Sequence, residues 1–241
     1  MTALLPYRNF FTIGIMRSRV SSKGQITIPV ELREDLGLRE GTLVIFERRP
    51  EGAMLRKGIT GEHPVDKNYG LLQLDTSVDK LLDEMRGATP ADPSATDSPA
   101  AMKIAVDTSV LLDVLAGDAT FGPASRDALR RAYDSGSLLA SDVVWSEVRA
   151  HFPSDKDFDA AMKSLGIQYV PLSDQAARLA GSFWRQYHQS RSRLRSDTGD
   201  GKRVIADFLI GAHAQLQAEA LLARDRGFFR SCFKQLQLIR P

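Results

Sequence analysis

Apolar and polar positions alternate in short runs over residues 17–59, a pattern that predicts short β-strands. The runs lie around Val20 and at 26–28, 42–46 and 53–55. Between the second and third runs, Pro29 suits the first turn of a helix and Gly37 suits its end, so one brief helix is predicted. Four short strands and one short helix bury too little apolar surface for a stable monomer. We therefore expect a second copy of the chain to complete this fold.

A different pattern follows over residues 102–241, where strand-like apolar runs alternate with longer helical patterns. The predicted strands are 103–106, 138–140, 167–170 and 221–223, and helical patterns cover 175–187 and 206–220 among others. This alternation predicts an α/β domain of three layers, in which helices cover both faces of a central parallel sheet.

Composition marks the boundaries between these parts. Residues 88–101 contain three prolines and no residue larger than Thr, Asp or Pro, so they are predicted to be a flexible linker. Residues 1–15 precede the first patterned segment and are interpreted as an extension. The chain is thus expected to carry a small domain (16–61), a connecting arm (62–87), the linker, and a larger domain (102–241).

The net charge of +2 conceals an uneven distribution. Residues 16–61 hold nine Lys and Arg against six Asp and Glu, whereas residues 62–100 hold three against eight. Residues 101–241 are again basic, with nineteen against sixteen. Two basic domains on either side of an acidic arm suit nucleic-acid binding. The acidic arm could also cover a basic surface.

The single cysteine, Cys232, excludes an internal disulfide framework and fits a reducing compartment, so a cytoplasmic protein is expected. No run of about 18 apolar residues is present, and no membrane partner is expected. The opening residues lack a basic start and a small-residue cleavage site, which argues against a signal peptide.

The small domain contains Ser-Lys-Gly-Gln-Ile-Thr-Ile-Pro at residues 22–29. In this motif and its surroundings it resembles the AbrB/MazE swapped-hairpin family, which includes transcription regulators and VapB-type antitoxins. The resemblance implies a β-rich homodimer, or a higher oligomer, that binds operator DNA. It assigns the DNA contacts to Arg17, Arg19, Lys23 and Gln25, with Arg33 a weaker candidate. The alternative is a solvated basic strand edge.

The arm carries an amphipathic helical pattern over residues 71–86, with apolar residues three and four positions apart. The apolar residues are Leu74, Val78, Leu81, Leu82 and Met85. Thr76 with Asp79 suggests the start of the helix and Gly87 its end. The segment resembles the toxin-binding tail of VapB antitoxins, in which an arginine often enters the acidic site of the toxin. Arg86 is the candidate for that role, and the alternative is a surface arginine at a helix C-terminus.

Four acids of the larger domain are predicted to meet at one edge of its sheet. Asp107 and Asp225 follow predicted strands, Glu147 lies early in the helix after residues 141–142, and Asp207 opens a later helix. The carboxyl ends of parallel strands form the reactive edge of such sheets.

The sequence around these acids resembles the PIN-domain nucleases, and VapC-type toxins most closely. The matching segments are VDTSVLLDVL (106–115), SEVRA (146–150), VIADFLIGAHA (204–214) and ARDRGFF (223–229). The resemblance implies that Asp107, Glu147, Asp207 and Asp225 bind Mg²⁺ or Mn²⁺ and that Ser109 or Thr108 assists. Carboxylates this close repel one another, so raised pKa values are expected in the absence of metal.

Basic residues flank the segment that leads into Asp207 and are candidates for holding RNA phosphates, with a solvated loop as the alternative. They include Arg195, Lys202 and Arg203. The function expected from the two resemblances is a metal-dependent endoribonuclease fused to an antitoxin that inhibits it and represses transcription. The alternative is a DNA-binding regulator whose PIN domain is inactive and serves assembly. The presence of all four acids argues against that alternative.

Overall fold

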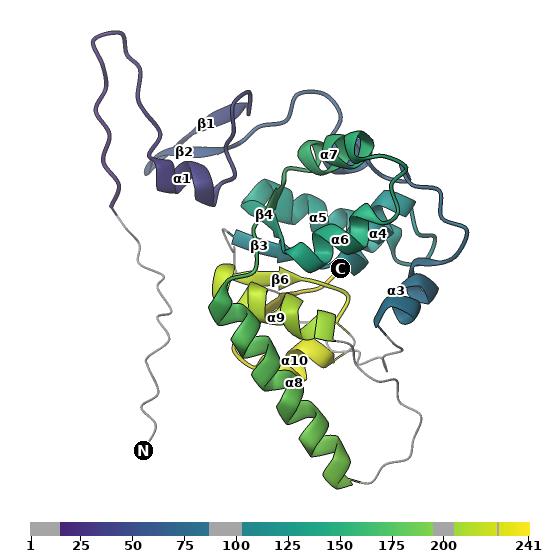
Figure 1. Cartoon of the computed structure of the whole chain (residues 1–241). Helices are drawn as coiled ribbons and strands as arrows, with labels where there is room; N and C mark the ends of the chain where they lie inside the picture. The colour runs from purple at the N-terminus through teal and green to yellow at the C-terminus, as the bar shows by residue number, and fades with distance from the viewer. Residues whose placement is uncertain (1–14, 87–102, 195–204, 226) are drawn as a thin grey trace, which may run out of the picture.

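The computed structural model describes residues 15–86, 103–194, 205–225 and 227–241. It contains a small N-terminal domain, an arm and a three-layer α/β domain (Figure 1). The predicted linker (88–101), nearly all of the predicted extension (1–15), and Arg195, Lys202 and Arg203 lie outside the described residues. None of the described helices is long and apolar enough to cross a membrane.

The N-terminal domain consists of a short helix and a β-hairpin. Helix α1 (Val30–Asp35) follows Pro29, and Gly37 lies just beyond its end with a φ of 61°, as the sequence predicted. Strands β1 (Val44–Arg49) and β2 (Gly52–Lys57) pair in antiparallel fashion.

The two strands predicted around Val20 and at 26–28 are absent from the described structure, and that prediction was wrong for the single chain. The segment instead makes a turn, in which the Ser21 amide donates to the Gln25 carbonyl at 2.8 Å. Apolar side chains of the domain remain open to solvent: Val20 is 68% exposed and Phe46 57%. A strand that finds no partner within one chain has no ladder of hydrogen bonds to hold it, which accounts for the difference.

The arm crosses the larger domain in an extended path that contains two helices, α2 (Pro64–Lys67) and α3 (Val78–Arg86). Between them, the Gly70 and Leu72 amides donate to carbonyls near the end of α4, at 2.9 and 2.6 Å. Ser77, and not the predicted Thr76, caps the start of α3: its hydroxyl accepts from the Lys80 amide at 3.3 Å. Gly87, the predicted end, lies outside the described residues.

The larger domain is built on five parallel strands in the order β5-β4-β3-β6-β7. The strands are β3 (Lys103–Val106), β4 (Ser137–Ala140), β5 (Ile167–Tyr169), β6 (Ala220–Leu222) and β7 (Gln237–Ile239). The sequence predicted the first four of them, and it missed the short edge strand β7.

Helices cover both faces of this sheet (Figure 1). From β3 to β5 the chain moves toward one edge, and from β5 to β7 it moves toward the other. Because crossover connections are right-handed, the helices of the two halves lie on opposite faces. The first half contains α4 (Thr108–Ala116), α5 (Gly122–Ser135), α6 (Asp142–Arg149) and α7 (Asp155–Ser164), and the second contains α8 (Asp174–Leu194), α9 (Ile205–Gln217) and α10 (Phe228–Cys232). The strand order changes direction between β3 and β6, where sites form in such sheets.

Lys57 attaches the N-terminal domain to the larger one. Its ammonium group donates to the carbonyls of Tyr133 and Gly136 at the end of α5, at 2.8 and 2.7 Å. Burial lowers the pKa of Lys57 to about 8, although the charge of Asp134 opposes this shift. The side chain thus gives hydrogen-bond donors to a helix C-terminus, where a positive charge is favourable.

The open apolar surface of the N-terminal domain leads to a prediction about assembly. We expect light scattering at micromolar concentration to find at least a dimer. Phe46→Glu should shift the dimer to a monomer, because the second chain would bury the charge of the new glutamate. Leu71→Glu is the matched control, since Leu71 is 51% exposed but belongs to the arm. A monomeric unmodified chain would contradict the prediction.

Candidate active site

Asp107 lies where β3 meets α4, at the change of strand direction. It is the N-cap of α4: its Oδ2 atom accepts from the Ser109 amide at 3.1 Å and from the Ser109 hydroxyl. These two bonds fix the orientation of the carboxylate and leave Oδ1 facing the arm. Ser109 therefore contacts the site through Asp107, and its assisting role in catalysis stays a prediction.

Two further acids come from distant parts of the chain. Glu147 is on α6, and Asp207 is in the first turn of α9. The Thr108 hydroxyl donates to Oε2 of Glu147, so the start of α4 orients this carboxylate as well. The structure therefore brings three of the four predicted acids to one place.

Arg86, the last residue of α3, lies among these three carboxylates. Its Nη1 atom is 2.8 Å from Oδ1 of Asp107 and 3.3 Å from Oδ1 of Asp207. Its Nε donates to Oε1 of Glu147 at 3.0 Å, and its Nη2 donates to Oε2 of the same residue. A planar guanidinium suits such a two-pronged contact with a carboxylate. Arg86 is only 6% exposed, so the structure has the inserted arginine and not the surface alternative.

The electrostatics of the site follow from this insertion. Burial opposes ionisation of Asp107, but the charge of Arg86 and the hydrogen bonds from Ser109 outweigh it and hold its pKa below the ordinary value. Burial also opposes protonation of Arg86, yet the surrounding acids raise its pKa well above the usual range. The expectation of a raised carboxyl pKa is therefore wrong for Asp107, because a buried cation of the arm already compensates its charge.

Asp225 has different surroundings. Its Oδ1 atom accepts from the amides of Gly227 and Phe229 at 3.1 and 2.9 Å, and its Oδ2 atom accepts from the Arg230 amide at 3.2 Å. Arg240 lies 3.6 Å from the same Oδ2. The carboxylate thus caps the start of α10, and its predicted role as a fourth metal ligand stays a prediction.

The chemistry of the donor set fits a hard divalent cation, which prefers carboxylate oxygens. The arrangement around Arg86 is not that of a metal cage, however. Within the part of the chain that the structure describes, no three Asp, Glu, His or Cys side chains are grouped closely enough to hold a metal ion. The three carboxylates surround a guanidinium, which supplies the positive charge that a metal would supply.

The predicted apolar residues of the arm, Leu81, Leu82 and Met85, are partly buried against the core of the larger domain, and Val78 is fully buried. Helix α3 packs beside α4 (Figure 1). Sequence reasoning missed a second polar contact of the arm, in which Asp79 pairs with Arg224 at 2.8 Å. The sequence signal that could have pointed to this contact is the position of Arg224 directly before the predicted site residue Asp225.

The residues predicted to face DNA lie together in the segment before α1. Arg17, Arg19, Lys23 and Gln25 are all exposed there, and Arg33 is exposed on α1. The Ser21 hydroxyl accepts from the amides of Lys23 and Gln25 at 3.3 and 3.2 Å, which shapes the turn between them. The basic side chains of the segment are therefore accessible to a polyanion.

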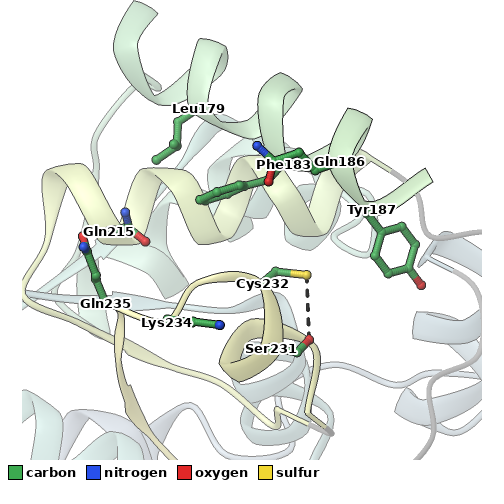
Figure 2. Close-up of a pocket in the computed structure, with 9 residues that line it drawn as sticks. All are labelled: Leu179, Phe183, Gln186, Tyr187, Gln215, Ser231, Cys232, Lys234 and Gln235. Carbon is green, nitrogen blue, oxygen red and sulfur yellow. Dashed lines mark hydrogen bonds between the residues drawn. The ribbon is translucent and has the colours of Figure 1, made fainter. Parts of the chain in front are cut away.

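A separate cavity of about 650 Å³ lies between α8 and α10. Figure 2 shows Phe183 and Tyr187 of α8 on one side of it, and Ser231 and Cys232 of α10 on the other. None of the four predicted acids lines this cavity.

Two protein families match the chain. The family described as PIN domain matches residues 104–234, which is more than half of the chain. The family described as antidote-toxin recognition MazE, bacterial antitoxin, matches residues 17–61. No curated protein is significantly similar to the chain.

Three solved structures are similar to part of the chain. VapBC2 from Rickettsia felis, bound to a DNA fragment from the promoter, has 12% identity and a TM-score of 0.39, and the match covers 58% of this chain and 98% of that one. A toxin–antitoxin complex from Klebsiella pneumoniae has 17% identity and a TM-score of 0.41, with 56% and 95% covered. FitAcB from Neisseria gonorrhoeae has 18% identity and a TM-score of 0.38, with 56% and 96% covered.

The family matches agree with the fold and with the order of the domains. PIN domains are typically nucleases that use a divalent metal. The chain belongs to the PIN-domain family and carries a MazE-type antitoxin domain ahead of its PIN domain, so that antitoxin and toxin are joined in one polypeptide.

Proposed function

We propose that the chain is a metal-dependent endoribonuclease whose active site is closed by its own arm. The observation that carries this proposal is the insertion of Arg86 among Asp107, Glu147 and Asp207. A regulator that kept its PIN domain only for assembly would need neither the three acids nor a buried arginine to cover them.

In the active state, Asp107, Glu147 and Asp207 would hold Mg²⁺ or Mn²⁺, and Asp225 would complete the set. Ser109 and Thr108 orient two of these carboxylates through their hydroxyl groups. When bound, the metal would lower the pKa of a water molecule and stabilise the charge that develops on the RNA phosphodiester. Basic residues before α9, with Arg195, Lys202 and Arg203 among them, are proposed to hold the RNA backbone.

Inhibition follows from competition for the same carboxylates. The guanidinium and a metal ion cannot both occupy the space between Asp107 and Glu147. Removing one partner of a buried ion pair costs about 3–5 kcal/mol, because the remaining charge stays buried without compensation. Arg86 will therefore leave only when another cation or water reaches the carboxylates. Because arm and nuclease belong to one chain, the arm has an effective concentration on the order of millimolar, which favours the closed state even on dilution.

The N-terminal domain is proposed to bind operator DNA as a dimer and to repress transcription of its own gene. Support comes from the match to the MazE family and from the exposed basic residues before α1. Lysine and arginine there would neutralise phosphates, and Gln25 would read a base edge.

The ribonuclease proposal predicts that a released arm gives activity. Leu81→Asp with Leu82→Asp in the full chain should raise Mg²⁺-dependent cleavage of total cellular RNA more than about tenfold, since about 1.4 kcal/mol of lost docking energy is enough for that factor. Adding Asp107→Asn should return cleavage to background, and EDTA should abolish it.

Two controls accompany this comparison. Lys80→Asp introduces the same side chain on the exposed face of α3 and should leave the chain inhibited. Asp127→Asn in the released chain removes an exposed acid of α5 and should leave cleavage intact. If the unmodified chain cleaved RNA as fast as the double variant, closure by the arm would be wrong.

The DNA-binding proposal predicts that Lys23→Ala weakens binding to the promoter upstream of the gene. The slope of log affinity against log salt should fall by about one unit, because one phosphate contact is lost. Band-shift titrations at several salt concentrations measure both quantities. Lys80→Ala removes the same charge from the arm and should have no effect, and equal losses in the two variants would contradict the assignment.

A further inference from the structure

A second arginine, Arg224, lies beneath the docked arm. Its side chain is 8% exposed and pairs with Asp79 of α3, with Nη1 and Oδ1 2.8 Å apart. Its Nε lies 3.1 Å from Oδ2 of Asp113, a contact that has the distance of an ion pair but not the geometry of a hydrogen bond. The guanidinium also lies over the ring of Phe121, 4.2 Å from its centre.

Arg224 belongs to the edge of the candidate active site. Its amide donates to the Ser109 hydroxyl at 3.3 Å, and that hydroxyl in turn donates to Asp107. Arg224 also directly precedes Asp225. A cation therefore lies beside the cluster of acids, held from within the PIN domain by Asp113 and Phe121.

The arm covers this cation with an anion. Asp79 and Arg86 are seven residues apart on α3, so they lie on one face, two turns and about 10 Å from each other. That length is about three nucleotides of a stacked strand, at a rise of about 3.4 Å each. The arm thus places a positive group among the acids, where the proposed metal would bind, and a negative group on Arg224, where a backbone phosphate of the RNA would bind.

We propose that Arg224 binds a backbone phosphate of the RNA substrate, and that Asp79 occupies this phosphate subsite when the arm is docked. The inference rests on the proposed ribonuclease function. Three features suit Arg224 to phosphate binding, namely a planar fork of donors, a ring that fixes the guanidinium plane, and a carboxylate that leaves when the arm leaves. Burial raises the pKa of Asp113 to about 7, and the charge of Arg224 opposes this shift.

The test measures RNA binding by the full chain with the arm released by Leu81→Asp and Leu82→Asp. The probe is a fluorescein-labelled single-stranded RNA of mixed sequence, with Ca²⁺ in place of Mg²⁺ to slow cleavage. Anisotropy at several salt concentrations gives the affinity and its salt slope. Adding Arg224→Gln should weaken binding about tenfold, as expected for a lost charge-assisted hydrogen bond, and reduce the slope by about 0.7.

Two further variants separate this role from a structural one. Arg224→Lys keeps the charge and should keep the slope. Arg224→Met with Asp113→Leu removes both buried charges, so neither is left without a partner, and it should lose the slope as Arg224→Gln does.

An unchanged salt slope in both charge-removing variants would overturn the phosphate subsite and leave the proposed function standing. A released chain that neither binds nor cleaves RNA before Arg224 is altered would overturn the proposed function, and this inference with it.

Discussion

The structure depends on the pairing of one buried arginine with three carboxylates. Asp107, Glu147 and Asp207 all contact the same guanidinium, that of Arg86. The low pKa of Asp107 reflects the presence of this cation. In the proposed function a metal ion would occupy the same acids, so there the arginine and the metal are alternatives. Regulation in this account is a choice between two cations for one set of oxygens.

Contacts of the N-terminal domain and of the arm position this arginine. Lys57 anchors the N-terminal domain at the end of α5, and the Leu72 amide bonds to a carbonyl near the end of α4. Val78 is buried at the start of α3, which sets the helix so that Arg86, at its other end, reaches the acids. Each contact contributes little alone. Together they hold α3 in place, so less conformational entropy remains to be lost when the Arg86 side chain binds the acids.

Much of this could be predicted from the sequence, because local patterns determined it. Asp107 follows a short apolar strand, and acids after parallel strands meet at one edge. The half-buried edge strand β7 was missed, although the equally short strands β5 and β6 were predicted. The strands around Val20 and at 26–28 failed because their pairing requires more than one chain. The predicted direction of the Asp107 pKa shift was wrong, because the shift depends on whether Arg86 is inserted among the acids. The sequence left that question open.

The most direct test of the account is the pKa of the Asp107 carboxyl, measured by carbon-13 NMR during a pH titration of the full chain. The account predicts a pKa below the ordinary 3.8 in the unmodified chain. It also predicts that Arg86→Gln raises this pKa, because the compensating charge is gone while Glu147 and Asp207 remain nearby. The same pKa in both proteins would show that Arg86 does not hold the acids, and would contradict the central claim.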